Sequence, residues 1–172
     1  MLEDDVPLQA LRVLAATHFA ISRSDPSKLG YVRLNRALWY SDLEHYRWHG
    51  VSITGLRTYK RTAQGPMADD ILAAVSRLVK EGKVAERTVA VADYSRREMI
   101  SLKEPDTSPL NVEQIVILER MTRLVESFSA SRLREITISD PLWRELENDQ
   151  AMLIATGSVI SRLQDSDAVR AE

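Results

Sequence analysis

Four polar side chains lie along one side of a single predicted helix. Residues 31–49 are expected to be helical, and at 3.6 residues per turn positions 35, 42 and 49 nearly superpose, with position 45 one turn before 49. The residues of this polar stripe are Asn35, Asp42, His45 and His49. Two histidines at i and i+4 can share a zinc ion, with a carboxylate as third ligand. The spacing therefore allows metal or acid–base chemistry.

A structural role is nevertheless the favoured interpretation of the polar stripe. The chain lacks the HExxH pattern, and its one other histidine is His18. Asp42 can instead accept hydrogen bonds from an imidazole or from backbone N–H groups. A triad of Ser41, His45 and Asp42 is disfavoured, because one helical turn by itself provides no oxyanion hole. We expect no catalytic residues, no metal and no cofactor.

The helix that carries the polar stripe is also the expected centre of the core. Bulky apolar side chains crowd it, and aromatic residues bury the most apolar area per residue. These side chains are Leu34, Leu38, Trp39, Tyr40, Leu43, Tyr46 and Trp48. Gly50 is expected to end the helix, and Gly55 marks a second turn.

The segment that follows is predicted to form a protein-binding surface. Residues 56–62 are rich in β-formers but alternate poorly, which favours an edge strand, and Gly65 and Pro66 are expected to start the next helix. Tyrosine and arginine dominate interface hot spots. The residues of the predicted surface are Arg57, Tyr59, Lys60, Arg61 and Gln64. A phosphate-binding loop here is disfavoured, because the run lacks repeated glycines.

The remaining segments predict a mainly α fold of the α+β class. Further helices are expected over residues 6–23, 66–81, 111–128 and 151–163, and another from about 129. Runs at 84–91 and 99–102 predict a hairpin, and a small antiparallel sheet shared with 56–62 is one option for it. Asn111 and Gln114 predict a capping box, and Trp143 a packing anchor. The expectation is a compact multi-helix domain around the central aromatic helix, with an antiparallel β-hairpin or three-stranded sheet.

Composition narrows the functional class. We expect one domain over residues 1–164 and a polar tail over 165–172. The net charge is −2 and the basic residues are scattered along the chain, so the sequence argues against nucleic-acid binding. The chain has no cysteine, its first residues do not follow a signal-peptide order, and no apolar run approaches the ~18–20 residues that span a bilayer. The cytoplasm is the expected location.

Five segments, in chain order, resemble the Panacea antitoxin domain, the SocA-like, phage-associated family. Residues 34–46, LNRALWYSDLEHY, resemble its LNKLLYFADFLHY-type helix, and residues 52–55 its SITG turn. Residues 59–66, YKRTAQGP, are similar to its strand and Gly-Pro helix start, and residues 78–84 to its helix end before a hairpin. Residues 129–143 resemble its late helix, although Thr137-Ile138 stands where a Ser-His pair is frequent.

The resemblance implies a bacterial or phage antitoxin that binds and masks a co-encoded protein toxin. Partners in this family include toxins similar to small alarmone synthetases. One branch is similar to a proteolytic adaptor that delivers its toxin to an AAA+ protease. The less favoured alternatives are a DNA-binding autoregulator and a metal-dependent enzyme that uses Asp42, His45 and His49. The sequence does not decide the oligomeric state, and a homodimer is one of the options.

Overall fold

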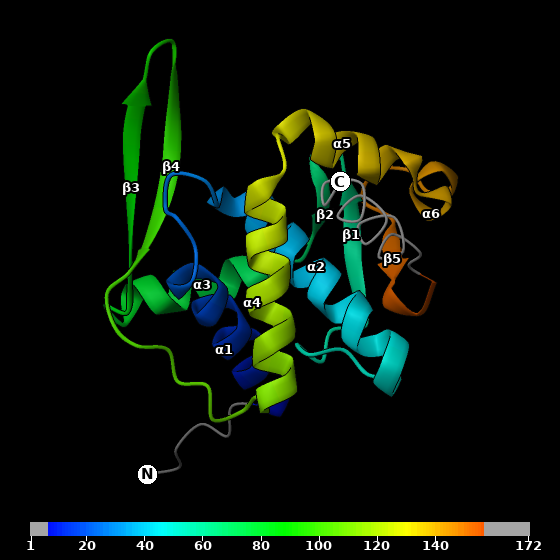
Figure 1. The fold of residues 1–172 in the computed structure, drawn as a ribbon, viewed down its shortest axis with the longest axis horizontal. Helices are drawn as coiled ribbons and strands as arrows, with labels where there is room; N and C mark the ends of the chain where they lie inside the picture. The colour runs from blue at the N-terminus through cyan, green and yellow to red at the C-terminus, as the bar shows by residue number, and fades with distance from the viewer. Residues whose placement is uncertain (1–6, 157–172) are drawn as a thin grey trace, which may run out of the picture.

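Helix α2 (Gly30–His49) runs through the middle of the protein, whose computed structural model describes residues 7–156. It contacts helix α1 (Leu8–Ser22), helix α4 (Val112–Ser127) and strand β2 (Gly65–Met67). In Figure 1, α4 crosses in front of α2. Leu34, Leu38 and Trp39 are at most 1% exposed, whereas Trp48 near the helix end is 69% exposed. The predicted central aromatic helix is confirmed.

Local sequence signals account for the helix ends. Gly50 ends α2 in a left-handed conformation, with φ of 69°, and its N–H donates to the Tyr46 carbonyl. Asn111 and Gln114 form the predicted capping box at the start of α4. The side chains of Ser129 and Asp140 cap helices α5 (Ala130–Ser139) and α6 (Pro141–Glu145). These short polar residues accept backbone N–H groups that would otherwise lack partners.

Strand β1 (Thr58–Thr62) is the middle strand of a three-stranded antiparallel sheet. The strand order is β2-β1-β5, with β5 formed by Ala151–Leu153. Tyr59 pairs with Met152 on one side, and Arg61 pairs with Pro66 on the other. The prediction of an edge strand is therefore wrong. Pairing with a segment about ninety residues away in sequence covers this edge, and local alternation does not report such a partner.

Gly65 and Pro66 belong to strand β2, so the prediction that they begin a helix is wrong. Thr62 pairs directly with Gly65, which leaves a two-residue hairpin loop. Pro66 is tolerated because β2 is an edge strand, where a missing N–H costs no ladder bond. The next helix, α3 (Asp69–Lys80), begins two residues after β2 ends, with Asp69 and Asp70 in its first turn.

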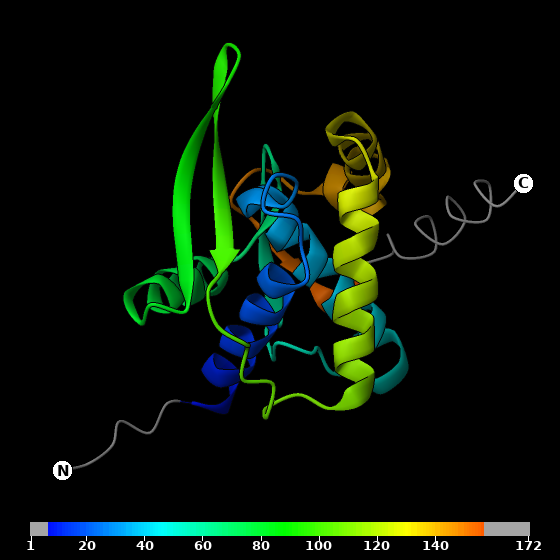
Figure 2. The same cartoon turned by 60° about the vertical axis from the view of Figure 1, so that its left-hand side comes forward.

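A second, two-stranded sheet projects from the body of the protein. It is the hairpin of strands β3 (Val84–Val91) and β4 (Tyr94–Ser101), and its tip extends beyond the helices in both Figure 1 and Figure 2. The hairpin is confirmed, with a longer second strand than predicted. The expectation that it shares a sheet with residues 56–62 is wrong, because β1 is already paired on both sides.

The end of the described chain departs from the predicted helix over 151–163. Residues 151–153 form β5, and Ile154–Thr156 form a short 3-10 helix, η1. Met152 and Ile154 are buried while Leu153 is exposed, which is the alternation of a strand. Residues 157–163 and the predicted tail, 165–172, lie outside the described residues. The mainly α fold with small antiparallel sheets is confirmed.

Candidate functional site

Asp42, in the middle of α2, is the centre of a buried hydrogen-bond network. Its side chain is fully buried. Asp42 Oδ1 accepts from the Thr54 backbone N–H at 3.0 Å, and Oδ2 accepts from Thr54 Oγ1 at 2.6 Å and from the Tyr59 hydroxyl at 2.8 Å. Thr54 Oγ1 in turn accepts from the Leu56 N–H at 3.1 Å. One carboxylate therefore ties α2 to the loop after it and to strand β1.

The surroundings of Asp42 shift its ionisation. Burial raises the pKa of Asp42 to about 6, although the hydrogen bonds from Thr54 and Tyr59 act in the opposite direction. Burial, reinforced by the negative charge of Asp42, also raises the pKa of Tyr59 well above its ordinary value. The donors around Asp42 are hydroxyls and backbone N–H groups, which are electrically neutral, so they only partly replace the water that the carboxylate has lost.

Asn35 and Arg36 hold the two ends of strand β2: Arg36 bonds the turn between β1 and β2, and Asn35 bonds the residue after β2. Asn35 Nδ2 donates to the Tyr31 carbonyl at 3.0 Å, and Asn35 Oδ1 accepts from the Ala68 N–H at 2.9 Å. Arg36 Nη2 donates to the Gln64 carbonyl at 2.9 Å. Gly65 has φ of 136°, and a Cβ there would lie 2.9 Å from Arg36 Nε. Glycine at position 65 is thus favoured by its backbone conformation, and a larger residue there would also displace the Arg36 guanidinium.

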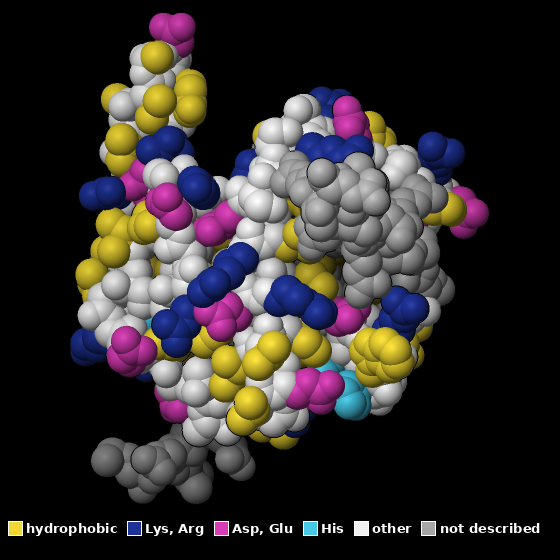
Figure 3. Space-filling model, in the orientation of Figure 1, with side chains coloured by type: hydrophobic (Ala, Val, Ile, Leu, Met, Phe, Trp, Pro, Cys, Tyr) yellow, Lys and Arg dark blue, Asp and Glu magenta, His cyan; other side chains and the backbone are white. Residues whose placement is uncertain are grey.

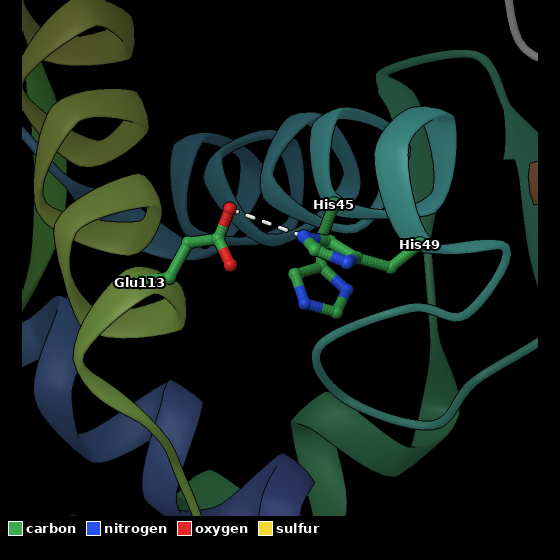
Figure 4. A group of neighbouring side chains, drawn as sticks. All are labelled: His45, His49 and Glu113. Atoms are coloured by element: carbon green, nitrogen blue, oxygen red, sulfur yellow. Dashed lines mark hydrogen bonds and ion pairs between the residues drawn. The ribbon is translucent and has the colours of Figure 1, made fainter.

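His45 and His49 occupy the last turns of α2. His45 is buried, and its Nδ1 donates to the Val51 carbonyl at 2.7 Å. His49 Nε2 lies 3.1 Å from Glu113 Oε1 on α4, and these two side chains are 40% and 56% exposed. The space-filling view shows histidine and acidic atoms side by side at the surface (Figure 3), and the close-up shows both rings beside Glu113 (Figure 4).

The predicted ligand and triad sets are not brought together. Asp42 binds Thr54 and Tyr59, so it is committed away from both histidines. Ser41 Oγ donates to the Ala37 carbonyl of its own helix at 2.7 Å. His18 is buried and lies 3.0 Å from Ser101 Oγ, and burial lowers its pKa. The neighbour that the sequence analysis missed is Glu113, whose place in the first turn of α4 was implied by the Asn111 cap.

The predicted binding surface divides into buried and exposed parts. Tyr59 is 1% exposed and packs edge-on against Trp39 with ring centroids 5.0 Å apart, so its place in an exposed surface is wrong. The cause is that the face of β1 that carries Tyr59 packs against Trp39 and Asp42 of α2. Arg61 is half-buried, donates to the Trp143 carbonyl at 2.8 Å and lies 4.4 Å above the Trp143 ring.

The remaining members of that predicted surface do lie on the outside. Arg57, Lys60 and Gln64 are exposed, and Lys60 Nζ forms an ion pair of 2.6 Å with Asp69. Trp143 is 6% exposed and packs as expected of an anchor, while Pro66 is buried next to it in the lining of one small pocket. The structure thus leaves Arg57, Lys60 and Gln64 exposed, and their part in binding stays a prediction.

No helix in the described residues combines the length and the apolar character needed to cross a bilayer.

Comparison with known proteins identifies the family. No curated protein and no solved structure matches the chain. A family model described as antitoxin SocA-like, Panacea domain, matches residues 34–144, which is more than half of the chain. The match begins inside α2 and ends inside α6, so it contains the Asp42 network, the hairpin and Glu113. The chain therefore belongs to the SocA-like antitoxin family that is defined by the Panacea domain.

Proposed function

We propose that this protein is an antitoxin that neutralises a co-encoded protein toxin by binding it directly. The observation that carries the proposal is the family match over residues 34–144. Direct binding accords with the way α2 uses its polar groups: Asn35 and Asp42 are buried and hydrogen-bonded to the loops and strands around them. In this proposal the helix is a scaffold, the action needs no catalysis, and it takes place in the cytoplasm.

The toxin-binding surface in this proposal is the exposed side of β1 and the depression beside it. Arg57 lines a depression of about 470 Å³ together with Arg12 and Tyr46. Arg12 Nε is buried and has no hydrogen-bond partner among the described residues. Arg12 and Arg57 place two positive charges at this depression. The depression therefore suits an acidic side chain of the partner, with Lys60 and Gln64 as flanking contacts.

Co-expression with the product of the neighbouring gene tests the proposal. We expect that product to stop growth when expressed alone, the present protein to restore growth, and the two to co-purify. Arg57→Glu should weaken restoration and co-purification, because it reverses the charge that faces the partner. Arg134→Glu, an exposed position on α5, is the matched control and should behave as wild type. A neighbour that is harmless alone would contradict the toxin–antitoxin proposal.

Masking is distinguished from delivery to a protease by following the amount of toxin. In masking, toxin accumulates as an inactive complex, and deletion of AAA+ proteases leaves both its amount and its neutralisation unchanged. A proteolytic adaptor would instead lower toxin levels only while the protease is present. Loss of neutralisation on protease deletion would therefore replace direct masking by delivery.

A further inference from the structure

Two histidines and a glutamate meet where the end of α2 faces the start of α4. One ring nitrogen of His45, one of His49 and one carboxylate oxygen of Glu113 all lie within 4.8 Å of one another. Figure 4 shows the two imidazoles one above the other, with Glu113 reaching toward them from the neighbouring helix. We propose that His45, His49 and Glu113 bind one zinc ion, which joins α2 to α4.

The hydrogen bond of His45 prepares it as a ligand. A carbonyl oxygen can only accept, so the 2.7 Å contact with Val51 O requires the proton on His45 Nδ1. Nε2 of a neutral ring then keeps its lone pair for a metal. Metal-bound histidines usually donate their other ring N–H to a carbonyl or carboxylate in this way, which fixes tautomer and ring orientation. Because His45 is buried, its ring is the fixed member of the group.

The other two members are close to the required spacing and free to adjust. A tetrahedral zinc ion with bonds of about 2.0–2.1 Å holds its ligand atoms roughly 3.4 Å apart. His49 Nε2 and Glu113 Oε1 are already 3.1 Å apart, and the His45 and His49 ring centroids are 4.5 Å apart. His49 and Glu113 are partly exposed, so rotation of their side chains can bring all three atoms to that distance.

The donor set selects the kind of ion. Two imidazoles and one carboxylate suit zinc and its transition-metal neighbours, whereas magnesium and calcium prefer all-oxygen sites. Three protein ligands leave a fourth position for water or for a side chain from a partner. His49 is the last residue of α2, where the helix dipole favours positive charge. An ion held by both helices would favour the folded state, in which the ligands are assembled.

Zinc titration of the untagged chain tests the site. We expect one zinc ion per chain by calorimetry and a zinc-dependent rise in melting temperature. His49→Gln and Glu113→Gln should each weaken zinc binding by at least about tenfold and remove the rise. Both positions are partly exposed, so both variants should keep the wild-type circular dichroism spectrum. Glu119→Gln, which removes a carboxylate that pairs with Arg123 on the same helix, is the matched control and should bind zinc like wild type.

The opposite results are equally definite. Absence of stoichiometric zinc binding by the wild-type chain would overturn the proposal. So would unchanged zinc affinity in both His49→Gln and Glu113→Gln, because the ion would then bind elsewhere. A rise in melting temperature that magnesium produces as well as zinc would also overturn it, since the proposed ligands discriminate against magnesium. None of these outcomes depends on the toxin.

Discussion

Asp42 on α2 and Glu98 on the projecting hairpin are both buried carboxylates, but their surroundings differ in kind. Asp42 is held by two hydroxyls and a backbone N–H, all neutral. Glu98 is 2% exposed and is held by two cations: Arg87 at 2.7 Å and Arg96 at 2.7 Å. Burial raises the pKa of Asp42 to about 6, whereas hydrogen bonds from Arg87 and Arg96 lower the pKa of Glu98.

The contrast shows what each carboxylate can do for the fold. Neutral donors orient a carboxylate and fix the segments around it, but they compensate only part of the lost hydration. Paired arginines favour the charged form itself. Asp42 therefore links α2, the 51–57 loop and β1. Because its pKa is raised, its contribution to the stability of the fold changes with pH above the range in which an ordinary aspartate titrates. Glu98 holds a two-stranded arm whose ion pairs persist at neutral pH.

The largest expected effect is that of Asp42→Ala. It leaves the Thr54 N–H, the Thr54 hydroxyl and the Tyr59 hydroxyl without their acceptor in a buried cavity. We expect a loss of about 3–5 kcal/mol in the free energy of unfolding at pH 5. Urea denaturation measures it. A loss below about 1 kcal/mol would mean that the network around Asp42 does not hold the fold together.

The next effect is the dependence of stability on pH. The pKa of Asp42 is raised from 3.8 to about 6 on folding, so between these values the folded state binds more protons than the unfolded state. Stability contributed by this group is therefore complete below about pH 4 and falls as pH rises through about 6, by roughly 3 kcal/mol.

Asp42→Asn provides the control for this pH effect, because an amide of the same shape does not titrate. The difference in unfolding free energy between wild type and Asp42→Asn, followed by urea denaturation from pH 4 to pH 7, should shift against wild type as pH rises. Taking the difference removes contributions from other titrating groups such as His18 and Glu126. A difference that is flat over this range would contradict a raised pKa for Asp42.

A smaller effect is expected from Tyr59→Phe, which removes one neutral donor and leaves the ring in place. The lost hydrogen bond of 2.8 Å should cost about 1–1.5 kcal/mol. The pKa of Asp42 should rise further, because that bond favours the charged carboxylate. Side-chain carboxyl NMR titration reads this directly. Tyr94→Phe, at an exposed position on the hairpin, is the control and should change neither quantity.

The smallest global effect is expected from Glu98→Gln. The hairpin projects from the body, so its loosening should raise amide hydrogen exchange in residues 84–101 and leave the denaturation midpoint nearly unchanged. Because the pKa of Glu98 is lowered on folding, its contribution is present above the ordinary glutamate range and is lost as pH falls through the lowered value. This is the opposite direction to Asp42. Global unfolding of Glu98→Gln would instead show that the whole fold depends on the ion pairs of the hairpin.

Local patterns were sufficient to predict α1, α2 and α4 and the signals that end or cap them, although not the start of α3. The aromatic face of α2, the capping box at Asn111 and the left-handed end at Gly50 are all signals carried within a few residues. The same holds for the β3–β4 hairpin, whose strands are adjacent in sequence. The wrong prediction of an edge strand did involve a distant partner: β5 turned residues 56–62 into a central strand, and packing of one face of β1 against α2 placed Tyr59 inside.

The sequence by itself determined that α2 carries Asn35, Asp42, His45 and His49 on one side, because helical geometry fixes that spacing. Only the tertiary structure decided their separate roles. Packing of β1 and the 51–57 loop against α2 gave Asp42 its donors, Thr54 and Tyr59. Packing of α4 brought Glu113 to His49 from more than sixty positions away. Side-chain chemistry depends on which groups replace water around it, and contacts between distant segments choose those groups.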